Sequence, residues 1–350
     1  MSLKVDITKR LGDFTLKVAF ETDGEILALL GASGCGKSMT LKCIAGVEKP
    51  DAGHIELDER VLFDSGQRID LPPQKRRVGY LFQQYALFPN MTVRQNIAAG
   101  ARHLPRAERR GRVDELIARM RLAGLEDKRP AQLSGGQQQR TALARILASE
   151  PEALLLDEPF SALDGYLKWQ VELELADLLR DFPGSVVWVS HDRSEVYRNC
   201  ASVCVLSAGR SEGQTSVAEL FRAPETKTSC LLSGCKNFSR IERIDDAHVR
   251  AVDWGAELRV PAVPDGAALL GIRAHYIRPA AEEGENVIRC RVRRVVDDVF
   301  STIVMLTPPG GEGEYARIRV EMTKEEWAAL DNPAELLLYM EPEAIMLLRD

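Results

Sequence analysis

The sequence predicts an α/β protein with a mostly parallel β-sheet, followed by a smaller β-rich domain. Short apolar runs, EILALLG (25–31), ALLLDEP (153–159) and SVVWVSH (185–191), alternate with helical patterns in the first part of the chain. Such alternation favours a parallel sheet that is covered on both faces. After APETKTSC (223–230) the chain becomes richer in valine, arginine and Pro–Gly turns. We therefore expect domains at 1–228 and 229–350.

Within the first domain, SMTLKCIAG (38–46) is the helix expected after the first apolar strand. HIELDERVLF (54–63) and RRVGYLFQ (76–83) are short alternating stretches typical of strands. From Thr92 to about Ser149 the pattern is helical, which predicts a helical subdomain at about 91–150. WQVELELADLLRDF (169–182) places its apolar residues on one helical face.

In the second domain, NVIRCRVRRVVDDVFSTIVML (286–306) and YARIRVEM (315–322) alternate in the manner of strands. The turn-rich stretch TPPGGEGE (307–314) separates them. This pattern predicts a small β-barrel of about five strands.

Composition excludes several classes of protein. The net charge of the 350 residues is −6, so the chain lacks the basic character of a nucleic-acid-binding protein. No apolar run approaches the roughly 20 residues that span a bilayer, and MSLKVDITKRLGDF lacks the apolar core of a secretion signal. Seven scattered cysteines indicate a reducing compartment. The pairs Cys200/Cys204 and Cys230/Cys235 have no further His or Cys to complete a zinc site.

The stretch GASGCGKS fits the phosphate-binding pattern G-x-x-x-x-G-K-[ST]. Glycines let backbone N–H groups turn toward phosphate oxygens, and the following helix presents its positive end to the same anion. We expect the lysine to reach the β- and γ-phosphates of ATP and the serine to bind Mg²⁺. A flexible turn is the alternative interpretation. The expected nucleotide-binding residues are Gly31, Ala32, Ser33, Gly34, Cys35, Gly36, Lys37, Ser38 and Met39.

The strand LLLDEP is expected to supply the second half of this site. A buried strand that ends in Asp157 places a carboxylate near the metal. Glu158 follows, and we assign it the role of the general base that activates water. An ordinary acidic turn is the alternative, but the phosphate-binding loop upstream favours the functional interpretation.

LSGGQQQR (133–140) completes a set of ordered motifs. GASGCGKS, the glutamine of YLFQQ, LSGGQ, LLLDEP, SALD and a lone histidine follow one another. In this order the chain resembles the ATPase subunits of ATP-binding cassette (ABC) transporters over residues 1–230. The resemblance implies a P-loop NTPase fold with a mixed sheet core and a helical subdomain.

The resemblance also implies roles for individual residues. Gln83 would contact Mg²⁺ and the membrane partner, and His191 would contact the γ-phosphate. Ser134, Gly135, Gly136 and Gln137 would form the loop that closes on ATP, and Asp164 would be the aspartate of the SALD segment. The adenine ring is usually stacked on an aromatic residue near the N-terminus. Leu11 holds that position, so Phe14 is the nearby candidate. Met39 stands where threonine is common and should leave phosphate binding intact.

One chain has two phosphate-binding helix ends for one nucleotide. Ser134 is expected to cap the helix that starts at Gly135, whose free N–H groups again suit a phosphate. In the family, two subunits pair head to tail so that each LSGGQ segment closes on the ATP bound by the other. Because the chain carries one copy of each motif, we predict a homodimer with two ATP sites.

A finer resemblance is to molybdate, tungstate and sulfate importer ATPases, in VLFDSGQRIDLPPQKRRVGYLFQQYALFP, SGCKNFSR and GIRAHYIRP. It implies a subunit at the cytoplasmic face of the membrane, bound to a separate permease that receives solute from an extracytoplasmic binding protein. Molybdate or tungstate is the favoured cargo. Sulfate, iron(III), polyamine and sugar importers, and a soluble ABC ATPase without a permease, are the alternatives.

The second domain resembles the transport-associated, oligonucleotide/oligosaccharide-binding-like (TOBE) domain of that group. One hypothesis is that it binds the transported oxyanion and holds the dimer in an inactive state, which requires different affinities for two states. The candidate residues are Arg291, Arg293, Ser301 and Thr302. The alternatives are a solvated strand face and a domain that only stabilises the dimer.

Overall fold

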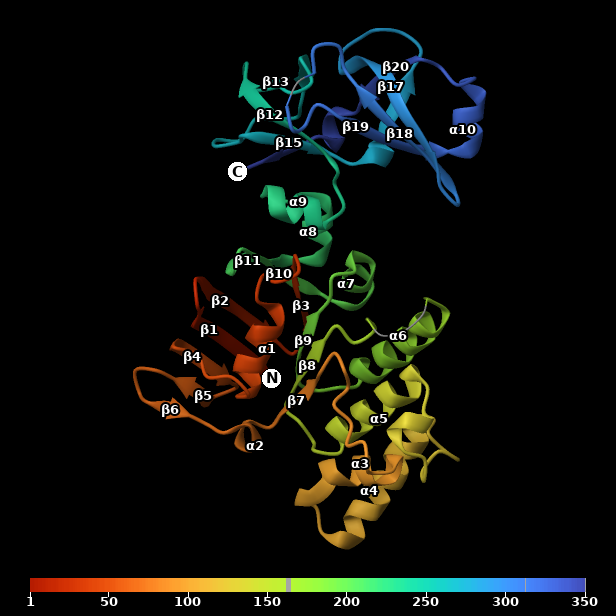
Figure 1. Cartoon of the computed structure of the whole chain (residues 1–350). Coiled ribbons are helices and arrows are strands. Elements are labelled where there is room, and N and C mark those ends of the chain that lie inside the picture. The colour runs from red at the N-terminus through yellow and green to blue at the C-terminus, as the bar shows by residue number, and fades with distance from the viewer. Residues whose placement is uncertain (162–164, 312, 350) are drawn as a thin grey trace. The chain divides into compact units, whose positions relative to one another are not determined.

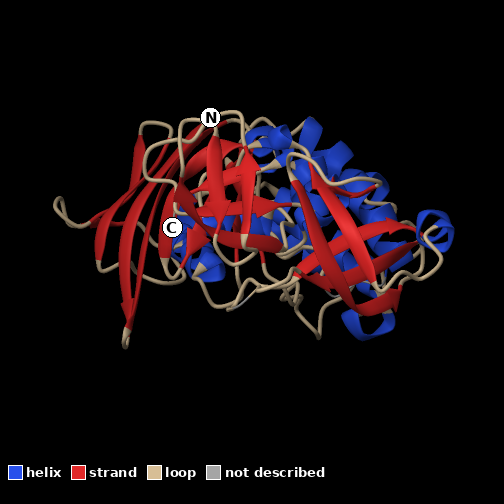
Figure 2. Cartoon of the chain, turned by 90° about the horizontal axis from the view of Figure 1, so that it is seen from above, coloured by secondary structure: helices blue, strands red, loops and turns tan. Residues whose placement is uncertain are grey.

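The computed structural model describes residues 1–161, 165–311 and 313–349, and the chain divides into two compact units, Met1–Val217 and Ala218–Asp350. Helices and strands are both abundant, as an α/β fold class requires (Figure 2). The division lies 11 residues before the expected boundary at 228/229. Phe221 and Glu225 lie between the two boundaries, and their carbonyl oxygens accept hydrogen bonds from the Arg273 side chain and the Arg349 N–H of the second unit.

In the described part of the first unit, eleven strands form one sheet in the order β6-β5-β4-β1-β2-β11-β10-β3-β9-β8-β7. The strands are β1 (Ser2–Leu11), β2 (Phe14–Asp23), β3 (Ile26–Gly31), β4 (Ala52–Leu57), β5 (Arg60–Asp64), β6 (Ile69–Asp70), β7 (Val78–Leu81), β8 (Ala153–Asp157), β9 (Ser185–Val189), β10 (Ser202–Ser207) and β11 (Arg210–Ser216).

The sheet is mixed rather than mostly parallel. Strands β10, β3, β9, β8 and β7 pair in parallel. The pairs β1–β2, β1–β4 and β4–β5 are antiparallel. The difference has a physical reason: short turns join β1 to β2 and β4 to β5, and a short turn can connect only antiparallel strands.

Ten α-helices lie in the described ranges. They are α1 (Lys37–Ala45), α2 (Pro73–Arg76), α3 (Val93–Gly100), α4 (Arg106–Arg119), α5 (Gly135–Leu147), α6 (Gly165–Arg180), α7 (Arg193–Asn199), α8 (Val217–Arg222), α9 (Lys227–Leu232) and α10 (Lys324–Ala329). Four single-turn 3₁₀ helices accompany them, at Ala101–His103, Pro130–Gln132, Ala274–Tyr276 and Pro342–Ala344. Among the described residues no helix combines the length and the apolar character needed to cross a bilayer.

Two hydrophobic cores cover opposite faces of the parallel strands. Leu154 and Leu156 of β8 belong to the core shared with α3, α4, α5 and α6, which gather on one side of the unit (Figure 1). Leu155, between them, points into the other core, together with Leu41 and Ile44 of α1. Alternate residues of a strand face opposite sides, so both faces of β8 are buried.

The second unit contains two antiparallel five-stranded sheets among its described residues, β14-β13-β12-β15-β21 and β16-β20-β17-β18-β19. Its strands are β12 (Asn237–Arg243), β13 (His248–Ala251), β14 (Ala256–Arg259), β15 (Leu269–Ile272), β16 (Ile277–Ala280), β17 (Val287–Asp297), β18 (Ser301–Thr307), β19 (Ile318–Thr323), β20 (Glu335–Met340) and β21 (Met346–Leu348).

One apolar core joins these two sheets, from Val249 and Leu270 of the first to Val304 and Leu338 of the second. In the second sheet the end strands β16 and β19 contact each other, so the sheet curls toward a closed barrel. The predicted fold class, an α/β core with a mixed sheet followed by a β-barrel-like domain, is confirmed. The second unit has ten strands among its described residues, rather than the roughly five that the sequence predicted.

Arg76 anchors the C-terminal end of α1, the helix that follows the glycine-rich loop after β3. Its side chain is fully buried. It donates hydrogen bonds to the carbonyl oxygens of Cys43 and Ile44, both at 2.8 Å, and of Leu71 at 2.7 Å. It also pairs with Asp70 at 3.1 Å. The guanidinium therefore satisfies carbonyl groups that a helix end otherwise leaves without partners.

We expect Arg76→Met to lower the free energy of unfolding by about 3 kcal/mol, because two buried helix carbonyls and a carboxylate lose their donor. Equilibrium urea unfolding followed by circular dichroism measures this change. The control is Arg77→Met, whose side chain is 54% exposed and pairs with Glu152; it should change stability by less than about 1 kcal/mol. Equal effects of the two substitutions would contradict the assigned role.

Candidate functional site

Four adjacent parallel strands place the motif residues at one edge of the sheet. Strand β3 ends at Gly31, β7 precedes Gln83, β8 ends at Asp157 and β9 precedes His191. In the ladder, Val189 of β9 is opposite both Leu29 of β3 and Asp157 of β8. Parallel strands end at the same edge, where ligands of such folds bind.

The loop between β3 and α1 has room only for glycine at two positions. A Cβ atom at Gly31 would lie 2.4 Å from the carbonyl oxygen of Leu206. A Cβ atom at Gly36 would lie 2.4 Å from Leu16 Cδ1, and the φ angle of Gly36 is 108°. Side chains would therefore push the loop out of this shape, which supports the expected need for glycine.

Lys37 is the first residue of α1, and its ammonium group bonds to the loop between β3 and α1. The Nζ atom donates to the carbonyl oxygens of Gly31 at 2.7 Å and Ala32 at 3.0 Å. No side chain caps the start of α1, where Gly36 is the N-cap residue. The helix N-terminus thus keeps its N–H groups for an anion.

The other predicted loop residues take different environments. Ala32, Ser33 and Gly34 are exposed, whereas Cys35 is buried, with its Sγ 3.8 Å from Lys37 Nζ. Met39 is partly buried against the core of α1.

Phe14, the candidate for adenine stacking, is partly buried and packs against the same core as α1. Its ring also lies beside Gly209, where a Cβ atom would come 2.9 Å from Phe14 Cζ. Leu11, its partner across the β1–β2 pair, is exposed. The adenine contact of Phe14 stays a prediction.

Asp157 is held between two hydroxyl groups. Ser38 Oγ donates to Asp157 Oδ1 at 2.9 Å, and Tyr80 OH donates to Oδ2, also at 2.9 Å. Burial, with the nearby carboxylate, raises the pKa of Tyr80, which therefore remains a proton donor. A hydroxyl beside a carboxylate is the oxygen donor set that Mg²⁺ prefers, so the pair fits that ion.

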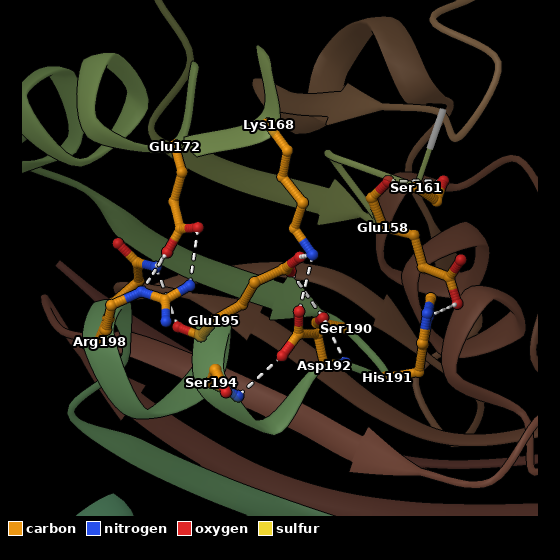
Figure 3. Close-up of polar contacts among 11 residues, drawn as sticks. Glu158, Ser161, Lys168, Glu172, Ser190, His191, Asp192, Ser194, Glu195 and Arg198 are labelled. Atoms are coloured by element: carbon orange, nitrogen blue, oxygen red, sulfur yellow. Dashed lines mark hydrogen bonds and ion pairs between the residues drawn. The ribbon is translucent and has the colours of Figure 1, made fainter. Parts of the chain in front are cut away.

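Glu158 adopts a left-handed backbone conformation, with a φ angle of 47°. Its carboxylate lies between two predicted site residues: Gln83 Nε2 donates to Oε2 at 3.1 Å, and His191 Nδ1 is 3.2 Å from Oε1. Figure 3 shows the carboxylate turned toward His191. Strained residues cluster at functional sites, so this geometry supports a functional role for Glu158.

A polar network holds the segment that carries His191 (Figure 3). Lys168 of α6 bonds to Asp192 at 2.7 Å and to Glu195 at 2.6 Å. Ser190 Oγ donates to the buried Glu195 at 2.7 Å and accepts from the Asp192 N–H at 2.9 Å. Burial alone would lower the pKa of Lys168, but its bonds to Asp192 and Glu195 outweigh burial and raise the pKa.

Ser134 caps α5, as the sequence predicts. Its hydroxyl accepts from the Gln137 N–H at 3.4 Å, and Gln137 Oε1 accepts from the Ser134 N–H at 3.0 Å. Gly135 and Gly136 form the first turn of α5. Within the described ranges, no hydrogen bond joins residues 134–137 to residues 31–38. Asp164 lies outside the described residues.

Sequence reasoning missed three residues that support the site. Tyr80 and Lys168 hold Asp157 and the His191 segment, as described above. Arg145, near the end of α5, donates to the carbonyl oxygens of Ala86 at 2.7 Å and Tyr85 at 3.1 Å. Tyr80 lies three residues before Gln83 in YLFQQ, and this spacing is the one sequence signal that could have indicated it. No local sequence signal indicates Lys168 or Arg145.

The four candidate oxyanion residues of the second unit lie on β17 and β18. Arg291 is opposite Thr307 in the β17–β18 ladder, whereas Thr302 is opposite Asp297 near the other end. Arg291 is exposed beside Glu335, and Ser301 bonds to Glu321. Thr302 is buried, while Arg293 is exposed. The antiparallel register therefore holds Arg291 and Thr302 apart, and the oxyanion hypothesis for these residues stays a prediction.

A family profile described as "ABC transporter" matches residues 15–161. The molybdenum import ATP-binding protein of Rhodospirillum rubrum is 40% identical over 64% of this chain; the match spans only 60% of that relative's length. The spermidine/putrescine import ATP-binding protein of Rubrobacter xylanophilus is 35% identical over 94% of this chain and 88% of its own length. A sulfate/thiosulfate import ATP-binding protein of Chromobacterium violaceum is 40% identical over 85% of this chain and 80% of its own length.

A solved structure of similar fold is a dimeric ATP-binding cassette in a post-hydrolysis state, bound to ADP and Pi. It is 29% identical, with a TM-score of 0.53, and the match covers 62% of this chain and 99% of that one.

We expect Tyr80→Phe to lower the free energy of unfolding by about 1–2 kcal/mol, because a buried oxygen of Asp157 loses its donor. The matched control is Tyr85→Phe: the Tyr85 hydroxyl is buried and has no hydrogen-bond partner among the described residues. Its removal should leave stability unchanged or slightly higher. Urea unfolding measures both, and a larger loss for Tyr85→Phe would contradict the assignment.

Proposed function

The chain belongs to the ABC transporter family, and from this premise we propose that it is the ATP-hydrolysing subunit of an importer. The observation that carries this proposal is the convergence of the glycine loop, Asp157 and the Gln83–Glu158–His191 contacts at one sheet edge. In this proposal the subunit works at the cytoplasmic face of the membrane. It powers a separate permease, which receives solute from an extracytoplasmic binding protein.

The phosphate groups of ATP are the anion that suits the glycine loop. The N–H groups at the start of α1 and the ammonium of Lys37 would bind the β- and γ-phosphates. Lys37 already bonds to two loop carbonyls, so it needs only to redirect one of its three N–H groups toward a phosphate oxygen.

Ser38, Gln83 and Asp157 are the residues suited to hold Mg²⁺, which would neutralise charge on the transferred phosphate. Tyr80 keeps the Asp157 carboxylate oriented through its hydrogen bond to Oδ2. Ser38 approaches the other carboxylate oxygen, so hydroxyl and carboxylate face one position.

Glu158 is the proposed general base. Its carboxylate would accept a proton from the water that attacks the γ-phosphate. Gln83 and His191, which contact its two carboxylate oxygens, would orient this water and stabilise the charge that develops on the phosphate. The network of Lys168, Asp192 and Glu195 keeps the His191 segment in place.

Two chains are needed for a complete site. Ser134, Gly135, Gly136 and Gln137 form a capped helix start, at which Ser134 is exposed, with no hydrogen bond to the glycine loop in the described parts of the chain. A head-to-tail homodimer would bring this segment, and Asp164, to the ATP bound by the partner. The dimeric state of the solved relative supports this arrangement.

Arg145 supplies a physical connection from ATP to the permease. It joins the end of α5, whose first turn would face the partner's ATP, to the segment that follows Gln83. Tyr85 and Ala86, whose carbonyls it binds, are left-handed, with φ angles of 57° and 45°. Closure of the dimer would therefore move the Gln83 segment, where the permease is expected to bind.

Molybdate or tungstate is the cargo that we propose. The motifs that resemble molybdate importers and the similarity to the Rhodospirillum rubrum protein support it. The sulfate/thiosulfate and spermidine/putrescine relatives are comparably similar, so these cargoes are the direct competitors. A soluble ATPase without a permease is the remaining alternative, and copurification with a membrane protein distinguishes it.

We expect Glu158→Gln to lower the ATPase rate by at least about 100-fold, because the base is lost. The variant should still bind ATP, and ATP should convert it into stable dimers visible by light scattering. The control is Glu115→Gln on α4, whose side chain is 54% exposed; its turnover should match wild type. Wild-type turnover in Glu158→Gln would show that the base is misassigned, and a monomer with ATP would contradict the dimer.

Elemental analysis of cells tests the cargo. A strain without this gene, grown on limiting micronutrients, should contain less molybdenum or tungsten than its parent. The gene carrying Lys37→Ala should fail to restore the element, because ATP would not be bound productively. If the strain instead contains less sulfur or iron, the proposed cargo is replaced by that element, and the assignment as an importer ATPase stands. No elemental change would favour an organic cargo or an ATPase without transport.

A further inference from the structure

Three sulfur-containing residues pack in one small core of the second unit, Cys230 and Cys235 with the distant Met346. Cys230 lies on α9, Cys235 precedes β12 and Met346 begins β21. The Sγ of Cys230 lies 4.0 Å from the Sδ of Met346, and the Sγ of Cys235 donates to the carbonyl oxygen of Asn237 at 3.3 Å. Both cysteines are fully buried, while Met346 is partly exposed. We call these residues the sulfur cluster.

Gly271 of β15 leaves the space that the sulfur cluster occupies. A Cβ atom at this position would lie 2.9 Å from the Sγ of Cys230 and 3.3 Å from the Sγ of Cys235. A side chain at 271 would therefore displace its sulfur neighbours. The fold therefore brings both thiols against the same glycine.

We propose that the sulfur cluster binds one soft monovalent metal ion, Cu(I), through the thiolates of Cys230 and Cys235 and the thioether of Met346. Thiolate and thioether ligands select Cu(I). A sulfur ligand lies about 2.3 Å from a metal such as zinc, and two sulfurs at that distance in a trigonal plane are about 4 Å apart. The separation between Cys230 and Met346 matches this spacing.

The site differs from the zinc site that the sequence excluded. Zinc structural sites use four thiolate or imidazole ligands, and the described residues contain no group of three His, Cys, Asp or Glu placed to share a metal. Two thiolates and a thioether fall short of that set. They suffice for Cu(I), and the partly exposed Met346 marks the side from which an ion would enter.

Binding would release the two thiol protons and leave a complex of net charge −1. Arg273 is the nearby cation that offsets this charge, and its Nη2 donates to Ser233 Oγ at 3.1 Å, between the two cysteines in sequence. Because α9 and β21 each supply a ligand, the bound ion would join them.

Competition for Cu(I) tests this proposal on the full chain. Under anaerobic conditions with ascorbate, the chain is titrated against the Cu(I) chelator bathocuproine disulfonate, and its colour reports the copper that the protein does not hold. Wild type should retain one more Cu(I) ion per chain than Cys235→Ser does. Met346→Leu should lower the affinity for that ion at least 10-fold. Cys290→Ser, which removes another buried cysteine of the same unit, should bind like wild type. X-ray absorption of the wild-type complex should show three sulfur ligands.

Met346→Leu keeps the test informative, because Leu replaces Met with little change in volume and leaves both thiols in place. Thermal unfolding of each variant without copper checks that the fold persists. Equal copper retention by wild type and Cys235→Ser would overturn the proposal. So would two sulfur ligands with no effect of Met346→Leu, or a Cys230–Cys235 disulfide that survives the reductant.

Discussion

The site depends on the parallel pairing of β3, β9, β8 and β7. Their backbone hydrogen bonds set which residue of each strand is the last before the loop, so the ladder determines the spacing between the motifs. A slip of one residue would turn every side chain to the opposite face. The Glu158 N–H bonds to the Val189 carbonyl at 3.0 Å, which extends the ladder one residue beyond β8. The general base of the proposal is thus held by backbone hydrogen bonds, although its own conformation is left-handed.

Around that edge, buried charge is stabilised by specific partners. Asp157 accepts from two hydroxyl groups, and Glu195 bonds to Lys168 and Ser190. An unpaired carboxylate at such depth would be strongly destabilising. The same partners restrict where the carboxylates point, so one set of contacts stabilises the fold and prearranges the site. Prearranged groups need no reorganisation when charge develops on a phosphate, which is how such sites accelerate phosphoryl transfer.

The second unit is built differently, with an apolar core between two antiparallel sheets. The sulfur cluster lies in a separate, smaller core with Phe238, Leu269 and Leu348. In that core α9 packs against β15, so the short helices after Val217 belong to the second unit. Hydrogen bonds from Arg273 and Arg349 to the segment after Val217 also tie it to the second unit, and the change in composition near residue 225 marks the boundary only approximately.

The sequence by itself determined which residues are candidates for the site: the glycine loop, Asp157 and Glu158, Gln83, the Ser134 cap and His191. Each lies in a short segment whose spacing reflects local geometry. Alternating and helical patterns likewise predicted both domains. The tertiary structure alone decided that Tyr80 supports Asp157, that Arg145 reaches the Gln83 segment, and that Met346 meets Cys230 across 116 residues. It also separated Arg291 from Thr302 in the β17–β18 register. The physical reason is strand register and packing, which bring distant segments together or hold them apart without any trace in local spacing.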